Sequence, residues 1–317
     1  NAWFTHELPE PGARMQRTQK LRRSRKRTAD SIVGIFSMKR VSVIGVGNMG
    51  GAMARRLLDG GYMVQVYDVD ATKTTHLKSF GAEALIDTAQ AAINSIATIV
   101  CVVDAAQTEQ VLFGPGGVAH NASKGHAVLL CPTMSPAHVE NFAARLAEHG
   151  ADCIDAPMSG GPARARTGQM SLMVACADAV FERHEPMLQH LAAQLFRISE
   201  KPGDGARTKL VNNLLAAINL AGATQTLALA TRLGLDAGKT LSVIEQSSGQ
   251  SWIGTDRLRR ALAGQATPLA HMTLLHKDTG LALSLDSAAR ANTLGIAAHA
   301  LFDHAVQAGL AHQDDSA

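Results

Sequence analysis

The chain has 317 residues, of which 46% are hydrophobic and 18% are charged, and its formal net charge is +3. This length allows two domains with sizeable cores, and the composition is that of a soluble globular protein. Residues 1–37 alone carry eight Lys or Arg and three acidic side chains, so the remaining chain is mildly acidic. The basic character therefore belongs to an N-terminal arm and excludes a nucleic-acid-binding surface on the globular part.

The N-terminal arm, residues 1–37, lacks the apolar periodicity of a folded segment, and we interpret it as a disordered extension. An Arg-rich targeting or anion-binding arm is the alternative. The four cysteines show no C-x-x-C spacing, which indicates free thiols in a reducing compartment and predicts a cytoplasmic location. We expect no membrane partner, because no apolar run reaches the roughly 18–20 residues of a membrane span and no secretory leader precedes the globular pattern.

From Met38 onward, strand and helix patterns alternate, which predicts βαβ units and a mostly parallel sheet with helices on both faces. The expected strands are 40–45, 63–68, 99–103, 127–131, 152–155, 170–175 and 195–198, and the clearest helices are 48–58 and 178–191. After about residue 203 the strand signals stop, and Gly and Pro separate helical stretches. These stretches are 205–233, 236–247, 251–263, 271–290 and 295–308. The sequence thus predicts an α/β domain at 38–202 and an all-helical substrate and oligomerisation domain at 203–317.

The first strand pattern runs into G-V-G-N-M-G, which places Gly45, Gly47 and Gly50 in G-x-G-x-x-G spacing. Between a strand and a helix, such glycines allow a tight turn, close approach of a pyrophosphate and packing of helix on strand. Asp68 ends the next strand, where a carboxylate accepts hydrogen bonds from the adenosine ribose and repels a 2′-phosphate. The pattern predicts a Rossmann-type site for NAD, with NADP possible; a glycine turn with a helix-capping Asp is the alternative without a cofactor.

Two later segments carry candidate chemistry. D-A-P-M-S-G-G-P (155–162) predicts a fixed loop whose N–H groups and Ser159 hydroxyl could bind a carboxylate, and a plain Gly-Pro turn is an equal alternative. G-D-G-A-R-T-K-L-V-N-N (203–213) places Lys209 and Asn213 four residues apart on one helix face. Such a lysine usually extends to solvent, but its polar neighbours favour a partly desolvated amine that exchanges a proton near neutral pH. Hydride transfer between an alcohol carbon and nicotinamide needs one such group.

Four blocks together resemble the β-hydroxyacid dehydrogenase family from about residue 39 to 317: G-V-G-N-M-G, D-A-P-M-S-G-G, G-A-R-T-K-L-V-N-N and H-K-D-T-G. That family includes 3-hydroxyisobutyrate dehydrogenase, tartronate semialdehyde reductase and L-threonate dehydrogenase. S-W-I-G-T-D-R-L (251–258) and the ending Q-D-D-S-A look most like the threonate-type branch. The resemblance implies an NAD-dependent oxidoreductase that transfers a hydride between a short-chain hydroxy acid and the nicotinamide.

The resemblance also implies a role for each matching residue. Lys209 is the catalytic acid/base, and the substrate is bound by Ser159, Gly160, Gly161, Asn213 and Lys277. The cofactor is bound by Gly45, Gly47, Asn48, Met49, Gly50, Asp68, Val102, Val103, Thr133 and Lys277. Two positions depart from the family pattern, since Pro132 stands where Ser is frequent and Arg164 stands where glycine is common.

Several functional alternatives stay open. An NADP(H)-dependent semialdehyde reductase of the tartronate or succinic semialdehyde type would use the same residues, whereas a non-catalytic dinucleotide-binding protein would not need Lys209. Imine-reducing relatives generally replace this lysine, so its presence favours oxygen chemistry. No histidine spacing predicts a metal site, and the apolar helix at 205–233 predicts a homodimer or homotetramer. The particular hydroxy acid and the direction of the reaction are open.

Overall fold

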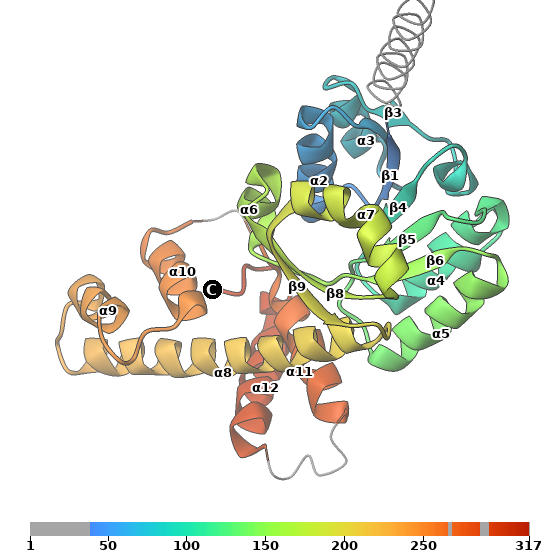
Figure 1. Ribbon diagram of the computed structural model, residues 1–317. Coiled ribbons are helices and arrows are strands. Elements are labelled where there is room, and N and C mark those ends of the chain that lie inside the picture. Colours follow the sequence, from blue (N-terminus) through green and yellow to red (C-terminus); the bar gives the residue numbers. More distant parts are fainter. Residues whose placement is uncertain (1–38, 266–267, 286–291, 317) are drawn as a thin grey trace, which may run out of the picture. The chain divides into compact units, whose positions relative to one another are not determined.

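The computed structural model describes residues 39–265, 268–285 and 292–316, so the predicted extension at 1–37 lies outside the described residues. Arg40–Ala317 form one compact unit around a nine-stranded sheet. Figure 1 shows helices on both faces of this sheet and a group of helices along the long helix α8 (Asp204–Arg232). The predicted α/β domain followed by a helical domain is confirmed. The exact boundary stays a prediction, and no helix or strand spans residues 200–203.

The sheet has the strand order β3-β2-β1-β4-β5-β6-β8-β7, and β9 pairs with β8. The pairs from β3 to β6 are parallel, β8 is antiparallel to β6 and β7, and β9 is parallel to β8. The strands are β1 (Arg40–Ile44), β2 (Met63–Tyr67), β3 (Glu83–Ala84), β4 (Ala97–Val100), β5 (Ala127–Leu130), β6 (Asp152–Asp155), β7 (Met158–Ser159), β8 (Met170–Ala175) and β9 (Ala192–Ser199). The first six strands therefore have the order of a dinucleotide-binding domain, whose ligands bind at the carboxyl ends of the strands.

Alternate residues of the central strands enter two apolar clusters, one on each face of the sheet. Ile99 packs in the cluster that contains Met53 and Leu188, whereas Val100 packs in the cluster that contains Phe142. Burial on both faces explains why these strands are mostly apolar. The helices of this half are α2 (Asn48–Asp59), α3 (Ala71–Lys78), α4 (Ala105–Phe113), α5 (Pro136–Glu148), α6 (Gly161–Thr167) and α7 (Asp178–Leu191).

The helical half is organised along α8, against which the helices α9 to α12 pack. After α8 follow α9 (Ala237–Glu245), α10 (Trp252–Leu262), α11 (Met272–Ser284), α12 (Thr293–Ala305) and a π-helical turn (Val306–Leu310). The last six residues of the helix predicted at 271–290 are Leu285 and five residues outside the described part of the chain. Among the described residues, α8 alone is long and apolar enough to span a membrane. This corrects the expectation that no segment reaches that limit. The helices α9 to α12 pack along α8, so its length and composition are only weak evidence for a membrane span.

Two short elements replace what the sequence predicts as one loop at 155–162. β7 exists because Met158 and Ser159 pair with Leu172 and Ser171 of β8, and α6 starts at Gly161. Neither element has a local signal, since a two-residue strand is determined by its distant partner. The strand expected at 99–103 begins two residues earlier, at Ala97, for the same reason, because Ala97 pairs with Val41 of β1.

Candidate active site

The glycine loop between β1 and α2 has three glycines with different surroundings. Gly45 has φ +83°, and a Cβ there would lie 2.7 Å from the Cys101 carbonyl oxygen. A Cβ on Gly50 would lie 2.0 Å from the Gly45 carbonyl oxygen, so both positions exclude any side chain. Gly47 caps the N-terminus of α2, and a Cβ there would meet nothing within 4 Å. Open space therefore lies in front of the helix N-terminus, which is where a pyrophosphate binds in this type of fold.

The Asp68 carboxylate closes this loop from β2. Its side chain is only 7% exposed. Oδ2 accepts a hydrogen bond from the Val46 N–H at 2.8 Å, and Oδ1 accepts one from the Asp70 N–H at 2.9 Å. The Lys73 ammonium lies 3.5 Å from Oδ1 and is half-exposed. Asp68 thus has a structural task beside the predicted contact with the ribose, and Lys73 partly offsets its negative charge.

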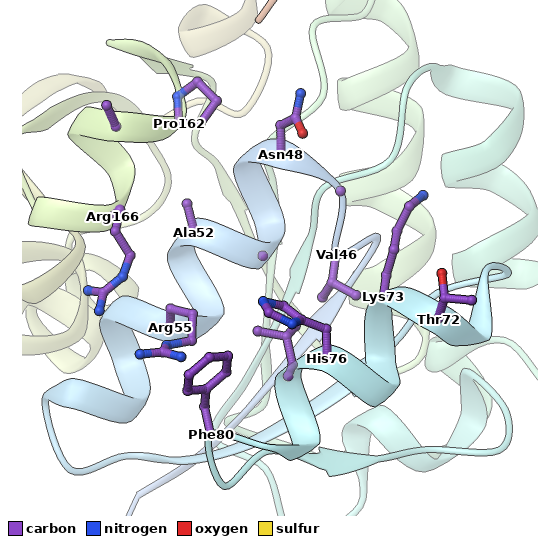
Figure 2. A pocket seen from close by; sticks show the side chains of 14 residues that line it. Val46, Asn48, Ala52, Arg55, Thr72, Lys73, His76, Phe80, Pro162 and Arg166 are labelled. Atoms are coloured by element: carbon purple, nitrogen blue, oxygen red, sulfur yellow. The ribbon is translucent and has the colours of Figure 1, made fainter. Parts of the chain in front are cut away.

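A pocket of about 780 Å³ opens beside the loop, between α2, α3 and α6. Figure 2 shows Asn48 at one end of this pocket and Arg55, His76 and Phe80 at the other. Its basic side chains are Arg55, Lys73, His76 and Arg166. The positive lining next to the helix N-terminus suits a phosphate-containing ligand. The predicted proton-transfer and carboxylate-binding residues do not line this pocket, so the reaction chemistry belongs elsewhere.

Asp155, at the end of β6, joins the two halves. Its carboxylate is buried, and Oδ2 accepts hydrogen bonds from the backbone N–H groups of Gly203 at 2.8 Å and Ala206 at 3.0 Å. A Cβ on Gly205 would lie 2.9 Å from this carboxylate, which is why glycine is required there. A carboxylate at a helix N-terminus is favourable, yet burial raises the pKa of Asp155 to about 6. Asp155 fixes the start of α8 and therefore the position of Lys209.

Lys209 is buried, with 9% of its surface exposed, so the interpretation of a surface lysine does not apply. Burial lowers the pKa of Lys209 to about 8, and the nearby Asp278 carboxylate opposes this shift. The Asn213 amide Nδ2 donates a hydrogen bond of 2.6 Å to Asp278 Oδ2. Asp278 is itself buried and lies on α11. Asp278 therefore holds the amide side chain of Asn213, which is predicted to bind the substrate. It also stabilises the charged form of Lys209, the predicted acid/base.

Lys277 continues this group of polar side chains toward the sheet. Its ammonium lies 3.2 Å from Asp278 Oδ1 and donates a hydrogen bond to the carbonyl oxygen of Thr133. Thr133 follows β5 at the carboxyl edge of the sheet. The structure thus brings together Thr133, Lys277, Asp278 and Asn213 from three separate segments, and Asn213 lies one helical turn from Lys209 on α8.

The remaining predicted site residues lie at the same edge of the sheet. Met49, in the first turn of α2, packs against the core, while Asn48 is exposed. Val102 and Val103 follow β4, and the Val103 N–H donates to Gln107 Oε1 at 3.1 Å. The Val102 side chain borders the glycine loop, since its Cγ1 would lie 3.1 Å from a Cβ on Gly45, whereas the backbone that approaches this glycine is that of Cys101.

The predicted carboxylate loop comprises Ser159, Gly160 and Gly161. Gly160 has φ +127° and Gly161 has φ +73°, conformations that favour glycine. Within the described residues the Ser159 hydroxyl makes no hydrogen bond, which leaves it available to a ligand. No hydrogen bond joins this loop to Lys209 in the described part of the chain. Both are nevertheless tied to Asp155, since Ser159 follows it by four residues and Lys209 follows its partner Ala206 by three.

Asp155 and Asp278 are the residues that sequence reasoning did not include in the site. The sequence gives a weak signal for each, because Asp155 opens the D-A-P-M-S-G-G block and Asp278 follows Lys277. Their hydrogen-bond partners are 48 to 65 residues away in the chain, so no local spacing could identify these pairs. Across the described ranges, no group of three or more His, Cys, Asp or Glu could hold a metal ion.

Comparisons with known proteins match this architecture. A family model described as the NAD binding domain of 6-phosphogluconate dehydrogenase matches residues 40–199. A second, described as NAD-binding of NADP-dependent 3-hydroxyisobutyrate dehydrogenase, matches residues 203–317. Together with the glycine loop, these matches define an NAD(P)-dependent oxidoreductase.

Similar proteins narrow this class to one family. L-threonate dehydrogenase of Escherichia coli K12 is 34% identical over 280 residues, which are 87% of this chain and 92% of that protein. 3-Hydroxyisobutyrate dehydrogenase of Pseudomonas aeruginosa is 32% identical over 286 residues, covering 87% and 95%. The crystal structure of 3-hydroxyisobutyrate dehydrogenase from Salmonella typhimurium gives a TM-score of 0.82 at 34% identity, covering 88% and 98%. The chain belongs to the β-hydroxyacid dehydrogenase family, as its four sequence blocks predict.

Proposed function

We propose that this protein is an NAD(P)-dependent dehydrogenase of a short-chain hydroxy acid, with Lys209 as its general acid/base. The observation that carries the proposal is the buried amine of Lys209, which is near the hydrogen-bonded pair Asn213–Asp278. The pKa of this amine is about 8. A group with a pKa near the working pH is suited to accept and return a proton. A non-catalytic dinucleotide-binding protein would have no use for a buried amine at this position.

Each of the site residues has a separate role in the proposed reaction. When bound, the nicotinamide supplies or accepts the hydride. Neutral Lys209 takes the hydroxyl proton during oxidation, and its ammonium form returns a proton during reduction. Asn213, held by Asp278, orients the reacting oxygen, while the Ser159 hydroxyl and the backbone of Gly160 grip the carboxylate.

The substrate we favour is threonate-like or 3-hydroxyisobutyrate-like, as in the similar proteins named above. A semialdehyde reductase remains the second candidate, because the same groups serve the reverse reaction. The test is a screen of NAD and NADP reduction at 340 nm over threonate, 3-hydroxyisobutyrate, glycerate and serine. Absorbance is expected to rise with at least one of them. A flat trace for every acid, with cofactor binding retained, would support the non-catalytic alternative instead.

Cofactor choice rests on Asp68 and Lys73. We infer a preference for NAD, because the Asp68 carboxylate would repel a 2′-phosphate. Asp68→Ala is expected to weaken NAD binding and to bring the Kd values for NAD and NADP closer together, with both values measured by fluorescence titration. Lys73→Ala is the matched variant, since it leaves the Asp68 carboxylate without its nearby ammonium. It should increase the difference between the Kd values for NAD and NADP. An unchanged preference in both variants would mean that another group reads the ribose.

We also propose that the protein is a homodimer or homotetramer. In α8, Val211 is 70% exposed and Leu215 is 58% exposed, and only 22% of the most apolar stretch of this helix is buried. An apolar face of this kind is stabilised when a second copy covers it. Sedimentation should show a species larger than the 33.4 kDa monomer, and Leu229→Glu should shift it toward the monomer. A wild-type monomer at micromolar concentration would refute this.

We also propose that the protein is cytoplasmic. It is supported by the four free cysteines, two of which are buried, since thiols persist in reducing compartments. No nucleic-acid or membrane partner is proposed.

A further inference from the structure

Arg164 lies directly beside the loop that we propose grips the substrate carboxylate. It belongs to α6, and its Cδ lies 3.0 Å from the position that a Cβ on Gly160 would occupy. The stem of the side chain therefore runs along the glycine, and the absence of a side chain on Gly160 makes room for it. From Cδ the side chain continues to the guanidinium, which lies near Trp252 of α10.

The guanidinium of Arg164 has no carboxylate within ion-pair distance in the described part of the chain, and the residue is exposed. Arg166, two residues further along α6, makes an ion pair of 2.5 Å with Asp59. Arg183 and Arg207 are likewise paired with carboxylates. Arg164 thus differs from these three arginines in that its five N–H donors are not used by an acidic side chain in the described residues.

Trp252 of α10 faces Arg164 from the helical half. The guanidinium carbon lies 5.8 Å from the Trp252 ring centroid, within the range of a cation–π contact. Trp252 is 53% exposed, so part of its ring is open beside the arginine. The contact places the guanidinium beside the ring, and within the described residues its N–H groups donate no hydrogen bond to the protein.

The position of Trp252 is itself fixed by buried ion pairs at the other end of α10. Arg257 lies 2.5 Å from Asp315, and Arg260 lies 2.7 Å from Asp314. Both aspartates are buried. These ion pairs hold α10 against Asp314 and Asp315, and so they help to position the Trp252 ring beside Arg164.

We propose that Arg164, supported by Trp252, selects hydroxy acids whose tail carries acceptor oxygens, and that a second carboxylate is its best ligand. The tail is the end of the substrate remote from the carboxylate held by Ser159 and Gly160. A guanidinium has donors only and pairs with a carboxylate through two parallel hydrogen bonds, so it ranks a carboxylate above a hydroxyl and a hydroxyl above a methyl. This inference rests on the proposed function and adds a specificity-determining residue to it.

The test compares three substrates that share a hydroxymethyl group and one carboxylate. They are 2-(hydroxymethyl)succinate, its monoamide with the tail carboxylate neutralised, and 3-hydroxyisobutyrate with a methyl tail. The wild type should show the highest kcat/KM for the diacid. In Arg164→Gln, kcat/KM for the diacid should fall roughly 10- to 100-fold, as for a lost charge-assisted hydrogen bond, and 3-hydroxyisobutyrate should change little.

Further variants separate recognition of the tail from a structural role. Arg164→Lys should restore part of the diacid activity, because it keeps the charge and loses the bidentate geometry. Trp252→Leu should raise KM for the diacid while kcat stays near wild type, as expected for a positioning residue. Arg183→Gln, an exposed arginine on α7, is the control and should leave all three substrates unchanged.

The outcomes distinguish the inference from the function on which it rests. If the wild type oxidises 3-hydroxyisobutyrate but does not favour the diacid, the assignment of Arg164 is wrong and the dehydrogenase stands. An equal loss on all three substrates in Arg164→Gln would also overturn it, because the arginine would then serve the shared carboxylate or the fold. If no acid is oxidised although NAD binds, the proposed function itself fails.

Discussion

Lys209→Ala is expected to lower kcat for hydroxy-acid oxidation by about 10²- to 10⁴-fold, the usual contribution of a positioned acid/base. Binding of NAD(P) should persist, because the glycine loop and Asp68 lie on β1, β2 and α2, and neither contacts Lys209. The other amine beside the Asn213–Asp278 pair, that of Lys277, is already bound to Asp278 Oδ1 and to the Thr133 carbonyl oxygen, so it does not replace Lys209. Steady-state kinetics at 340 nm and a cofactor titration measure the two quantities.

Three controls make the Lys209 result specific. Lys201→Ala removes an exposed lysine that precedes α8 and should keep wild-type turnover. Lys209→Met keeps the length of the side chain without the amine, and thermal unfolding shows whether either substitution harms the fold. Small primary amines added to Lys209→Ala should restore part of the turnover. Near-wild-type kcat in Lys209→Ala would refute the mechanism.

Asp278→Asn is expected to move the pH dependence of both directions to lower pH. The carboxylate stabilises the ammonium form of Lys209, so removing it lowers the pKa of the amine below its present value of about 8. In oxidation the neutral amine is active, so kcat/KM rises with pH, and this rise should occur at lower pH in the variant. In reduction the ammonium is active, so activity should decline at lower pH than in the wild type.

The same substitution should also lower the maximal kcat roughly tenfold, because Asn213 exchanges a charge-assisted hydrogen bond for a neutral one. Asp303→Asn, a half-exposed carboxylate on α12 that pairs with His276, is the matched control and should leave the profile in place. A pH profile that stays unchanged in Asp278→Asn would show that this carboxylate does not influence the proton-transfer group.

The fold could largely be predicted because its signals are local. β5 is a continuous apolar run, β1 is apolar apart from Arg40 and Ser42, and the glycines that bound α2 stand within a few residues of the turns they form. The elements that were missed have no such signal. β7 and the start of β4 are determined by pairing with strands that lie elsewhere in the chain.

For the site, the spacing of residues in the chain is enough to place Gly45, Gly47 and Gly50 in one turn and Lys209 and Asn213 on one helix face. Both follow from backbone geometry that spans at most one or two helical turns. The packing of α8 against α11 and against Asp155 decides two further features. Lys209 is buried, and Asp278 lies beside Asn213. Desolvation and neighbouring charge set a pKa, and both are properties of packed segments from distant parts of the chain. The linear order of residues therefore identifies a candidate proton-transfer lysine, and the packing of the two halves gives it a pKa of about 8.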